Sequence, residues 1–213
     1  SRHYAMASKV PMLEPADSME AYTFAKNAFE LSEKFDTPVL LRMCTRIAHS
    51  QSIVETGERV PATLKDYEKN PAKYIMAPAN AIKRHPLVEE RTLKLQEFAE
   101  NCEYNVVEMN SDEIGIITSG CSYQYVKEVM GDSASILKIG MSYPLPVKLI
   151  KDFASKVKTL YVIEELDPFI ENHVKALGID CIGKEKFSIL GEFSQNTIAK
   201  AFDKELPESV SAD

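Results

Sequence analysis

The feature that most restricts the fold is an alternation of short apolar runs and helical patterns, which begins at Leu87. Apolar runs at residues 114–118, 136–139 and 160–163 are each followed by a turn and by apolar residues at helical spacing. Strands that alternate with helices over short connections form right-handed βαβ units around a parallel sheet. The sequence therefore predicts the α/β class, with helices flanking a parallel sheet. The other elements expected in this block are a helix, a strand and a terminal helix, at residues 87–102, 105–108 and 191–202.

A shorter pattern occupies residues 1–55. Asp17 or Ser18 is placed to cap a helix whose apolar residues recur at helical spacing as far as Phe35. A Thr-Pro dipeptide then ends the helix, and residues 39–41 have the apolar character of a buried strand. Such a strand needs cover on both faces, which one helix cannot give. We therefore predict a truncated α/β piece at the N-terminus, whose neighbouring strands lie elsewhere in this chain or outside it.

Between these two patterns, residues 56–86 contain four prolines and many charged residues, with no sustained period of 3.6 or 2. A structureless stretch of about 30 residues is uncommon inside a compact domain, so we expect an interdomain linker here. The predicted division is an incomplete first domain at 1–55, the linker at 56–86, a second domain at 87–205 and a short tail at 206–213.

The charge balance argues against two classes of partner. The 213 residues include 32 acidic and 25 basic ones, and the net charge of −7 gives no general attraction for nucleic acid or an anionic membrane. No stretch approaches the ~20 apolar residues of a membrane span. The four cysteines lie far apart without a CxxC pair, so no metal site is predicted, and a reduced, cytoplasmic setting is expected.

Three predicted turns after strands contain candidate ligand or interface residues, because ligands bind at the carboxyl edge of open parallel sheets. Gly120 lies in a strand-to-helix turn whose backbone N–H groups could receive an anion, although a tight turn alone also requires a small residue. Tyr143 and Pro144 belong to a predicted rigid loop, KIGMSYPLP, where ligand binding and simple helix initiation are equally good explanations. Glu164 and Glu165 could provide acid–base chemistry, but helix capping and interface hydrogen bonding explain them better.

The first block contributes a fourth candidate site, in the run LRMCTRIAHS directly after its strand. Arg42, Thr45, Arg46 and His49 are residue types that bind a carboxylate or a phosphate group. The alternative is a solvated loop whose arginines pair with local acids. We favour a substrate-binding role, because this loop also follows the carboxyl end of a strand. The chain contains none of the glycine-rich signatures of P-loop, dinucleotide or α/β-hydrolase sites.

Longer runs of the chain resemble one enzyme family. The end of the pyrimidine-binding domain in the large (alpha) subunit of indolepyruvate ferredoxin oxidoreductase is similar to LEPADSMEAYTFAKNAFELSEKFDTPVLLRMCTRIAHSQSIVE. The transketolase carboxyl-terminal-like domain of that subunit is similar to IGIITSG and ILKIGMSYPLPVKLIKDFASKVKTLYVIEELDPFIENHVKALGI, in the same order. Because these runs cover most of the chain, the resemblance implies an internal segment of that subunit.

The resemblance implies an enzyme, an oxidoreductase that oxidatively decarboxylates arylpyruvate to aryl-acetyl-CoA and passes the electrons to ferredoxin. Its cofactors would be thiamine diphosphate, Mg²⁺ and iron–sulfur clusters. The family motifs for these groups are not found in this chain, so we expect the chain alone to bind none of them and to be inactive. The implied partners are the remaining domains of the same subunit, a smaller partner subunit, ferredoxin and coenzyme A.

The resemblance also suggests roles for the candidate residues. The four named in LRMCTRIAHS would face the substrate end of the thiamine site once the rest of the enzyme is present. The five positions at strand ends, from Gly120 to Glu165, would form turns or interfaces, with contact to coenzyme A or a neighbouring subunit as the alternative. No catalytic residue is expected in this chain.

A second function class stays open, namely a stand-alone, non-catalytic α/β module that binds a partner subunit or a small anion. The truncated first block discriminates between the two, because a free-standing module should not contain a strand without neighbours. That strand could also join the edge of the second domain's sheet or pair with another copy in a dimer.

Overall fold

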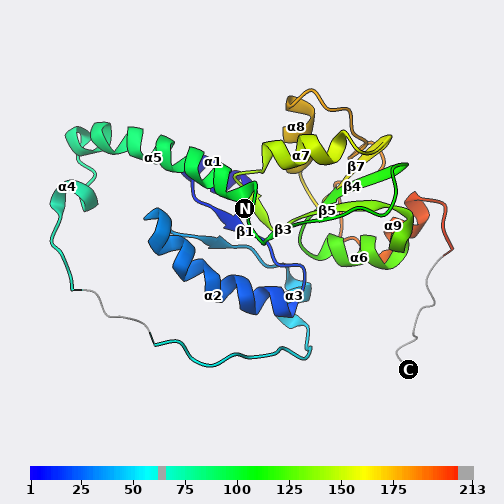
Figure 1. Cartoon of the computed structure of the whole chain (residues 1–213), viewed down its shortest axis with the longest axis horizontal. Helices are drawn as coiled ribbons and strands as arrows, with labels where there is room; N and C mark the ends of the chain where they lie inside the picture. The colour runs from blue at the N-terminus through cyan, green and yellow to red at the C-terminus, as the bar shows by residue number, and fades with distance from the viewer. Residues whose placement is uncertain (62–65, 206–213) are drawn as a thin grey trace.

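The computed structural model describes residues 1–61 and 66–205, so the predicted tail at 206–213 lies outside the described residues. The larger of two sheets has the strand order β3-β5-β4-β7 (Figure 1). Its strands are, in chain order, Asn105–Glu108, Ile114–Thr118, Ser135–Ile139 and Thr159–Ile163. β4 pairs in parallel with β5 and β7, as predicted, whereas β3 runs antiparallel to β5 at one edge. The expected α/β class is confirmed, but the sheet is mixed rather than parallel throughout.

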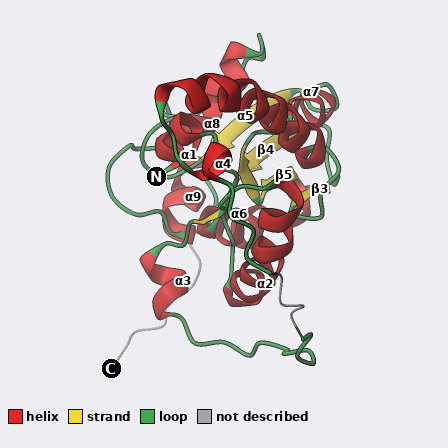
Figure 2. Cartoon of the chain, turned by 90° about the vertical axis from the view of Figure 1, so that its left-hand side faces the viewer, coloured by secondary structure: helices red, strands yellow, loops and turns green. Residues whose placement is uncertain are grey.

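Helices cover both faces of this sheet, which explains why its central strands β4 and β5 are mostly apolar and buried almost throughout. Neighbouring residues of a strand point to opposite faces. Ile117 and Leu137 pack with helices α7 and α8, whereas Ile116 and Ile136 pack with helices α6 and α9. The two helix layers and the sheet between them are visible from the end in Figure 2. These helices are, in chain order, Cys121–Met130 (α6), Val147–Ala154 (α7), Phe169–Ala176 (α8) and Gln195–Ala201 (α9).

The smaller sheet combines two strands of the first block with one strand of the predicted second domain. Its order is β2-β1-β6, built from Leu40–Leu41, Met12–Leu13 and Met141–Tyr143. β1 pairs in parallel with β2 and antiparallel with β6. The predicted strand near residue 40 therefore has neighbours within this chain, so it gives no argument against a free-standing module. The predicted loop KIGMSYPLP is also wrong in part, because three of its residues form β6.

At the turn from β5 to β6, the backbone at Gly140 lies close to that of Tyr104. Asn105 Oδ1 accepts hydrogen bonds from the backbone N–H groups of Gly140 and Met141, both at 3.0 Å. A Cβ atom on Gly140 would lie 2.3 Å from the carbonyl oxygen of Tyr104, so only glycine fits here. This turn lets one continuous segment contribute to both sheets.

Two long helices pack with the smaller sheet. α2, Ser18–Phe35, begins as predicted, because Asp17 Oδ1 accepts the N–H of Glu20 at 2.8 Å. α5, Pro78–Ala99, begins nine residues before the predicted start near Leu87 and continues through Pro86. The irregular stretch expected at 56–86 is therefore partly helical, and it also contains the short α4, Pro71–Tyr74. The shared core of the two long helices and the sheet includes Leu13, Phe24, Leu31, Leu95, Tyr104 and Met141.

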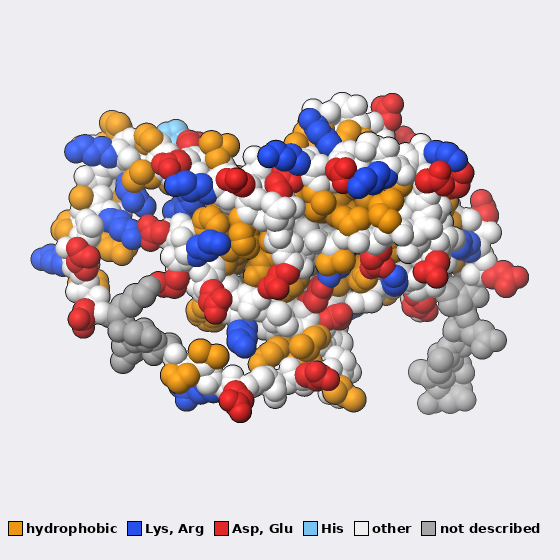
Figure 3. Space-filling model, viewed as in Figure 1, with side chains coloured by type: hydrophobic (Ala, Val, Ile, Leu, Met, Phe, Trp, Pro, Cys, Tyr) orange, Lys and Arg blue, Asp and Glu red, His pale blue; other side chains and the backbone are white. Residues whose placement is uncertain are grey.

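Asp36, directly after α2, accepts hydrogen bonds from both α4 and α5. Asp36 Oδ1 accepts from Lys73 Nζ at 2.6 Å, and the Asp36 carbonyl oxygen accepts from Arg91 Nη1 at 2.7 Å. Figure 3 shows basic side chains gathered at this end of the molecule, where α4 and α5 approach α2. The remaining short helices are α1 (Arg2–Ser8), α3 (Thr45–His49) and the 3-10 turn η1 (Gly131–Ser133). None of the helices in the described ranges is both long and apolar enough to span a membrane.

Candidate functional site

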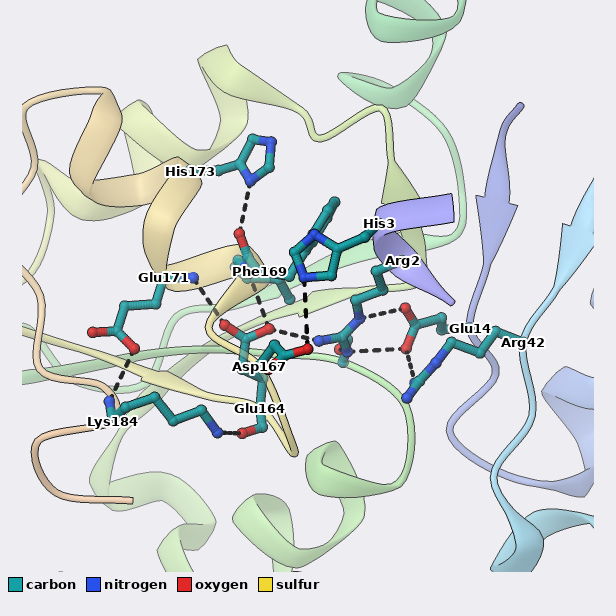
Figure 4. A network of polar contacts seen from close by, with 12 residues as sticks. Arg2, His3, Glu14, Arg42, Glu164, Asp167, Phe169, Glu171, His173 and Lys184 are labelled. Atoms are coloured by element: carbon teal, nitrogen blue, oxygen red, sulfur yellow. Dashed lines mark hydrogen bonds and ion pairs between the residues drawn. The ribbon is translucent and has the colours of Figure 1, made fainter. Parts of the chain in front are cut away.

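Four strand ends from both sheets meet at one place. Glu14 follows β1, Arg42 follows β2, Ser119 follows β4 and Glu164 follows β7. Arg2, on α1, donates to Glu14, Ser119 and Glu164, and Arg42 joins them through Glu14 (Figure 4). We call these five residues the Arg2 cluster. It lies at the carboxyl edge of the parallel strands, where open α/β sheets usually bind ligands.

Arg2 is the centre of this cluster and is only 7% exposed. Its Nε and Nη2 atoms donate to the two oxygens of Glu14 at 2.6 and 3.0 Å. Nη1 donates to Glu164 Oε2 at 2.5 Å, and Nη2 also donates to Ser119 Oγ at 2.5 Å. Arg42 Nη1 reaches the same Glu14 carboxylate at 2.7 Å. One guanidinium therefore ties α1, β1, β4 and β7 together through charge-assisted hydrogen bonds.

The electrostatics of Glu14 follow from its two arginine partners. Burial alone would raise its pKa, but the charges of Arg2 and Arg42 and the hydrogen bonds from Arg2 lower the pKa to about 2. The pKa of Arg2 is raised, because the Glu14 and Glu164 charges outweigh the cost of its burial. This part of the site is therefore a fixed ion pair at neutral pH rather than a proton donor or acceptor.

The pKa of Glu164 shifts in the opposite direction to that of Glu14. Burial raises its pKa, and the Arg2 charge only partly opposes this shift. Its two oxygens accept the backbone N–H groups of Ile170 and Glu171, at 3.0 and 2.9 Å, in the first turn of α8. The Lys184 ammonium donates to the Glu164 carbonyl oxygen. Glu164 thus caps the first turn of α8, and its predicted part in an interface stays a prediction.

Arg46 and Glu165 form a second ion pair beside the Arg2 cluster. Arg46 Nη2 lies 2.6 Å from both Glu165 oxygens, and Arg46 Nη1 donates to the carbonyl oxygen of Phe193 at 3.1 Å. Glu165 also accepts the N–H of Phe193 at 2.6 Å. The Arg46 guanidinium stands over the Tyr125 ring, 5.6 Å from its centroid. Although burial opposes it, Glu165 raises the pKa of Arg46.

The structure thus brings Arg42, Arg46, Glu164 and Glu165 together with Gly120, from positions up to 123 residues apart. Gly120 has a φ of 56°, a conformation that favours glycine, and it precedes the first residue of α6. The loop expected after β2 is instead the short helix α3, on which Thr45 and His49 are exposed.

Tyr143 and Pro144 lie elsewhere. Tyr143 pairs with Met12 in the smaller sheet and packs on the core under α7. Tyr143 ends β6 and Pro144 follows it, so their position supports a structural role at the end of this strand. Their predicted part in an interface or a ligand edge stays a prediction.

The cysteines differ from expectation. Cys44 and Cys121 form a disulfide across 77 positions of sequence, whereas Cys102 and Cys181 are free thiols. The sequence predicts reduced cysteines, because a pairing between two separate blocks leaves no spacing signal. Both bonded cysteines line a cavity of about 20 Å³ with Arg2, Glu14, Arg42 and Glu165, which has room for a water molecule.

Sequence reasoning missed Arg2, Glu14 and Ser119. Glu14 follows the apolar pair Met12-Leu13, and this pattern repeats the one at Arg42 and Glu164, where a polar residue follows a short apolar strand. That repeated pattern could have predicted Glu14. The strand before Arg42 is not buried as predicted, because Leu40 is 38% exposed. Arg2 lies 162 positions from Glu164 and has no local signal.

This chain is similar to known proteins in sequence and in fold. No family model matches the chain. The indolepyruvate oxidoreductase subunit IorA of Archaeoglobus fulgidus is 37% identical over 185 residues, which cover 84% of this chain and 30% of that protein. The subunit of the same name from Methanothermobacter thermautotrophicus is 35% identical over 215 residues, covering 94% of this chain and 35% of that protein. The predicted family resemblance is confirmed. The chain spans about a third of the length of the IorA subunits that it matches.

A solved structure shares the fold. The 2-oxoglutarate:ferredoxin oxidoreductase from Magnetococcus marinus, solved with 2-oxoglutarate, coenzyme A and succinyl-CoA bound, matches with a TM-score of 0.60 at 18% identity. The match covers 91% of this chain and 41% of that chain. At this identity the likeness concerns the arrangement of helices and strands, which supports the α/β class independently of the IorA sequences.

Proposed function

We propose that this chain is a segment of a thiamine diphosphate-dependent 2-oxoacid:ferredoxin oxidoreductase that converts arylpyruvate to aryl-acetyl-CoA. The observation that supports it best is the identity to IorA subunits over at least 84% of the chain. The proposal implies a cytoplasmic enzyme whose partners are a smaller subunit, ferredoxin and coenzyme A.

Arg46 is the residue that we assign to the carboxylate of the 2-oxoacid. Its Nη2 is bound by the Glu165 carboxylate at 2.6 Å, so a carboxylate already occupies the position that a substrate would take. A substrate carboxylate can exchange with Glu165 without any change in the kind of contact. Arg42 adds charge nearby: its Nη1 is fixed by Glu14, and within the described residues no partner contacts its Nη2.

The residues described here do not fit a complete thiamine site. Among residues 1–61 and 66–205, no group of three or more His, Cys, Asp or Glu side chains could hold a metal ion. The cavity beside Arg42 is about 20 Å³, far smaller than a cofactor. The family resemblance assigns thiamine diphosphate, Mg²⁺ and the iron–sulfur clusters to other parts of the enzyme. The contribution of this chain is therefore substrate recognition and assembly.

The test uses the full-length subunit with its partner subunit, in an assay of electron-acceptor reduction by indolepyruvate with coenzyme A. Arg46→Lys keeps a positive charge but loses the flat, two-pronged contact. It is expected to lower kcat/KM for indolepyruvate by about 10- to 100-fold, the value of a hydrogen bond to a charged group. The matched control is Arg84→Lys on α5, where Arg84 Nη2 pairs with the partly exposed Asp36 at 3.7 Å. Equal kcat/KM values for the two variants would contradict the assignment of Arg46 to the substrate carboxylate.

The oxidoreductase segment and the stand-alone module predict native polypeptides of different length. An antibody raised against this chain, used on an extract of the source organism, should detect a polypeptide roughly three times longer, since the matched segment is 30% of an IorA subunit. A native band at 23.9 kDa would instead support the module that binds a partner subunit or a small anion.

A further inference from the structure

The Cys44–Cys121 bond joins two segments that the rest of the fold holds only by side-chain contacts. Cys44 precedes α3, and Cys121 is the first residue of α6. Arg42 and Arg46 lie two residues to either side of Cys44. The bond thus connects the substrate-binding candidates of the first block to the strand end of the larger sheet. We propose that it is a reversible, redox-sensitive clasp.

Position and pairing separate these two cysteines from the others, since Cys181 is also partly exposed. Cys44 and Cys121 are partly exposed and line the same cavity as the Arg2 cluster. Cys102 is buried, and burial raises its pKa. Burial also raises the pKa of Cys181 to about 11, so little of its thiolate is present at neutral pH. Of the four cysteines, Cys44 and Cys121 are the two that are paired with each other and lie beside the Arg2 cluster.

The clasp acts on α3 because the other links to that helix are few. Arg46 contacts Glu165 and Phe193 on the side of the larger sheet, and Ser18 Oγ lies 3.0 Å from Ser50 Oγ on the side of α2. After Ser50 the chain runs through exposed residues to position 61 without a helix or strand. Without the covalent bond, the Arg46 contacts and the buried Ile47 side chain remain to hold α3.

The chemistry is a thiol–disulfide exchange that balances without a metal. A small-molecule disulfide such as oxidised glutathione accepts two electrons from the two thiols. One cysteine thiolate first forms a mixed disulfide and releases one glutathione, and the second cysteine then displaces the other glutathione. The products are the Cys44–Cys121 bond and two molecules of glutathione. A dithiol reductant reverses both steps.

An effect of the clasp on substrate binding depends on the proposed function. The bond itself and its effect on residues 42–50 can be tested without turnover, so the two ideas fail separately. The chain is incubated with oxidised glutathione or with dithiothreitol, alkylated with iodoacetamide and digested for mass spectrometry. Peptides containing Cys44 and Cys121 should be joined after oxidation and separately alkylated after reduction.

Two further readouts test the constraint. In the reduced chain, amide hydrogen exchange at residues 42–50 should be at least about tenfold faster than in the oxidised chain. The Tm should fall by roughly 10 °C, because the bond closes a loop of 77 residues. Cys44→Ser should abolish both differences, and Cys181→Ser, the matched control, should keep them. Separate alkylation of the two cysteines after oxidation, or equal exchange at residues 42–50 in both states, would overturn the clasp.

Discussion

Replacing Glu14 by glutamine is expected to remove a defined part of the acid sensitivity of this fold. Glu14 is 1% exposed and accepts three hydrogen bonds from Arg2 and Arg42. These contacts lower its pKa from 4.5 in the unfolded chain to about 2 in the folded chain. Between these values the unfolded chain binds the proton first, so the free energy of unfolding falls as the pH falls.

The magnitude follows from the difference between the two pKa values. At 1.36 kcal/mol per unit, the ionised Glu14 contributes about 3 kcal/mol to the free energy of unfolding. The full contribution is present above about pH 5 and is lost as the pH falls toward 2. Glu164 works in the opposite direction, because its raised pKa means that the folded chain takes up its proton first. Only the difference between wild type and the Glu14 variant isolates this contribution.

The assay is urea unfolding followed by circular dichroism at a series of pH values from 7 down to 3. Glu14→Gln should lower the free energy of unfolding by about 3 kcal/mol at pH 7, and the gap to wild type should narrow toward pH 3. The control is Glu90→Gln on α5, where an exposed carboxylate contacts Lys94. Its unfolding midpoint should match wild type. A gap between Glu14→Gln and wild type that is constant with pH would refute the argument.

Further predictions concern individual positions, each checked by urea unfolding of the chain. Gly120→Ala should cost about 1–2 kcal/mol because of the positive φ at Gly120, whereas Gly57→Ala, in open space, should cost nothing measurable. Phe153→Ala should cost about 3–5 kcal/mol, because Phe153 is 1% exposed in the core under α7, whereas Phe29→Ala at an exposed site should cost little. Asp17→Ala should cost about 1 kcal/mol through loss of the α2 cap, and Asp17→Ser should restore most of it.

The central part of the fold could be predicted because its signals are local. Strands β4, β5 and β7 of the larger sheet are mostly buried between helix layers, so each is a short, mainly apolar run that stands out from its surroundings. The α2 helix is similarly clear, because Asp17 provides a cap before a long amphipathic stretch. Carboxyl-edge reasoning also selected Arg42, Arg46, Glu164 and Glu165 as candidates, since each follows a strand, but the sequence does not predict that the two blocks bring them together.

The remaining features depend on contacts that no local pattern encodes. β1 and β2 have two residues each, too few for a period, and β6, the second pairing partner of β1, comes more than 100 positions after β1. The N-terminal half of α5 was missed because Pro86 is a common helix breaker, yet the helix continues through it. Arg2 and the Cys44–Cys121 bond depend on the docking of the first block against the larger sheet, which only the folded chain defines.

The central claim is that this chain belongs to an enzyme that oxidises arylpyruvate. The most direct test captures the native polypeptide from the source organism without oxygen, using an antibody against this chain, and measures viologen reduction. The account predicts reduction that requires both indolepyruvate and coenzyme A. Captured, intact polypeptide that reduces no acceptor with indolepyruvate or any other 2-oxoacid would contradict it.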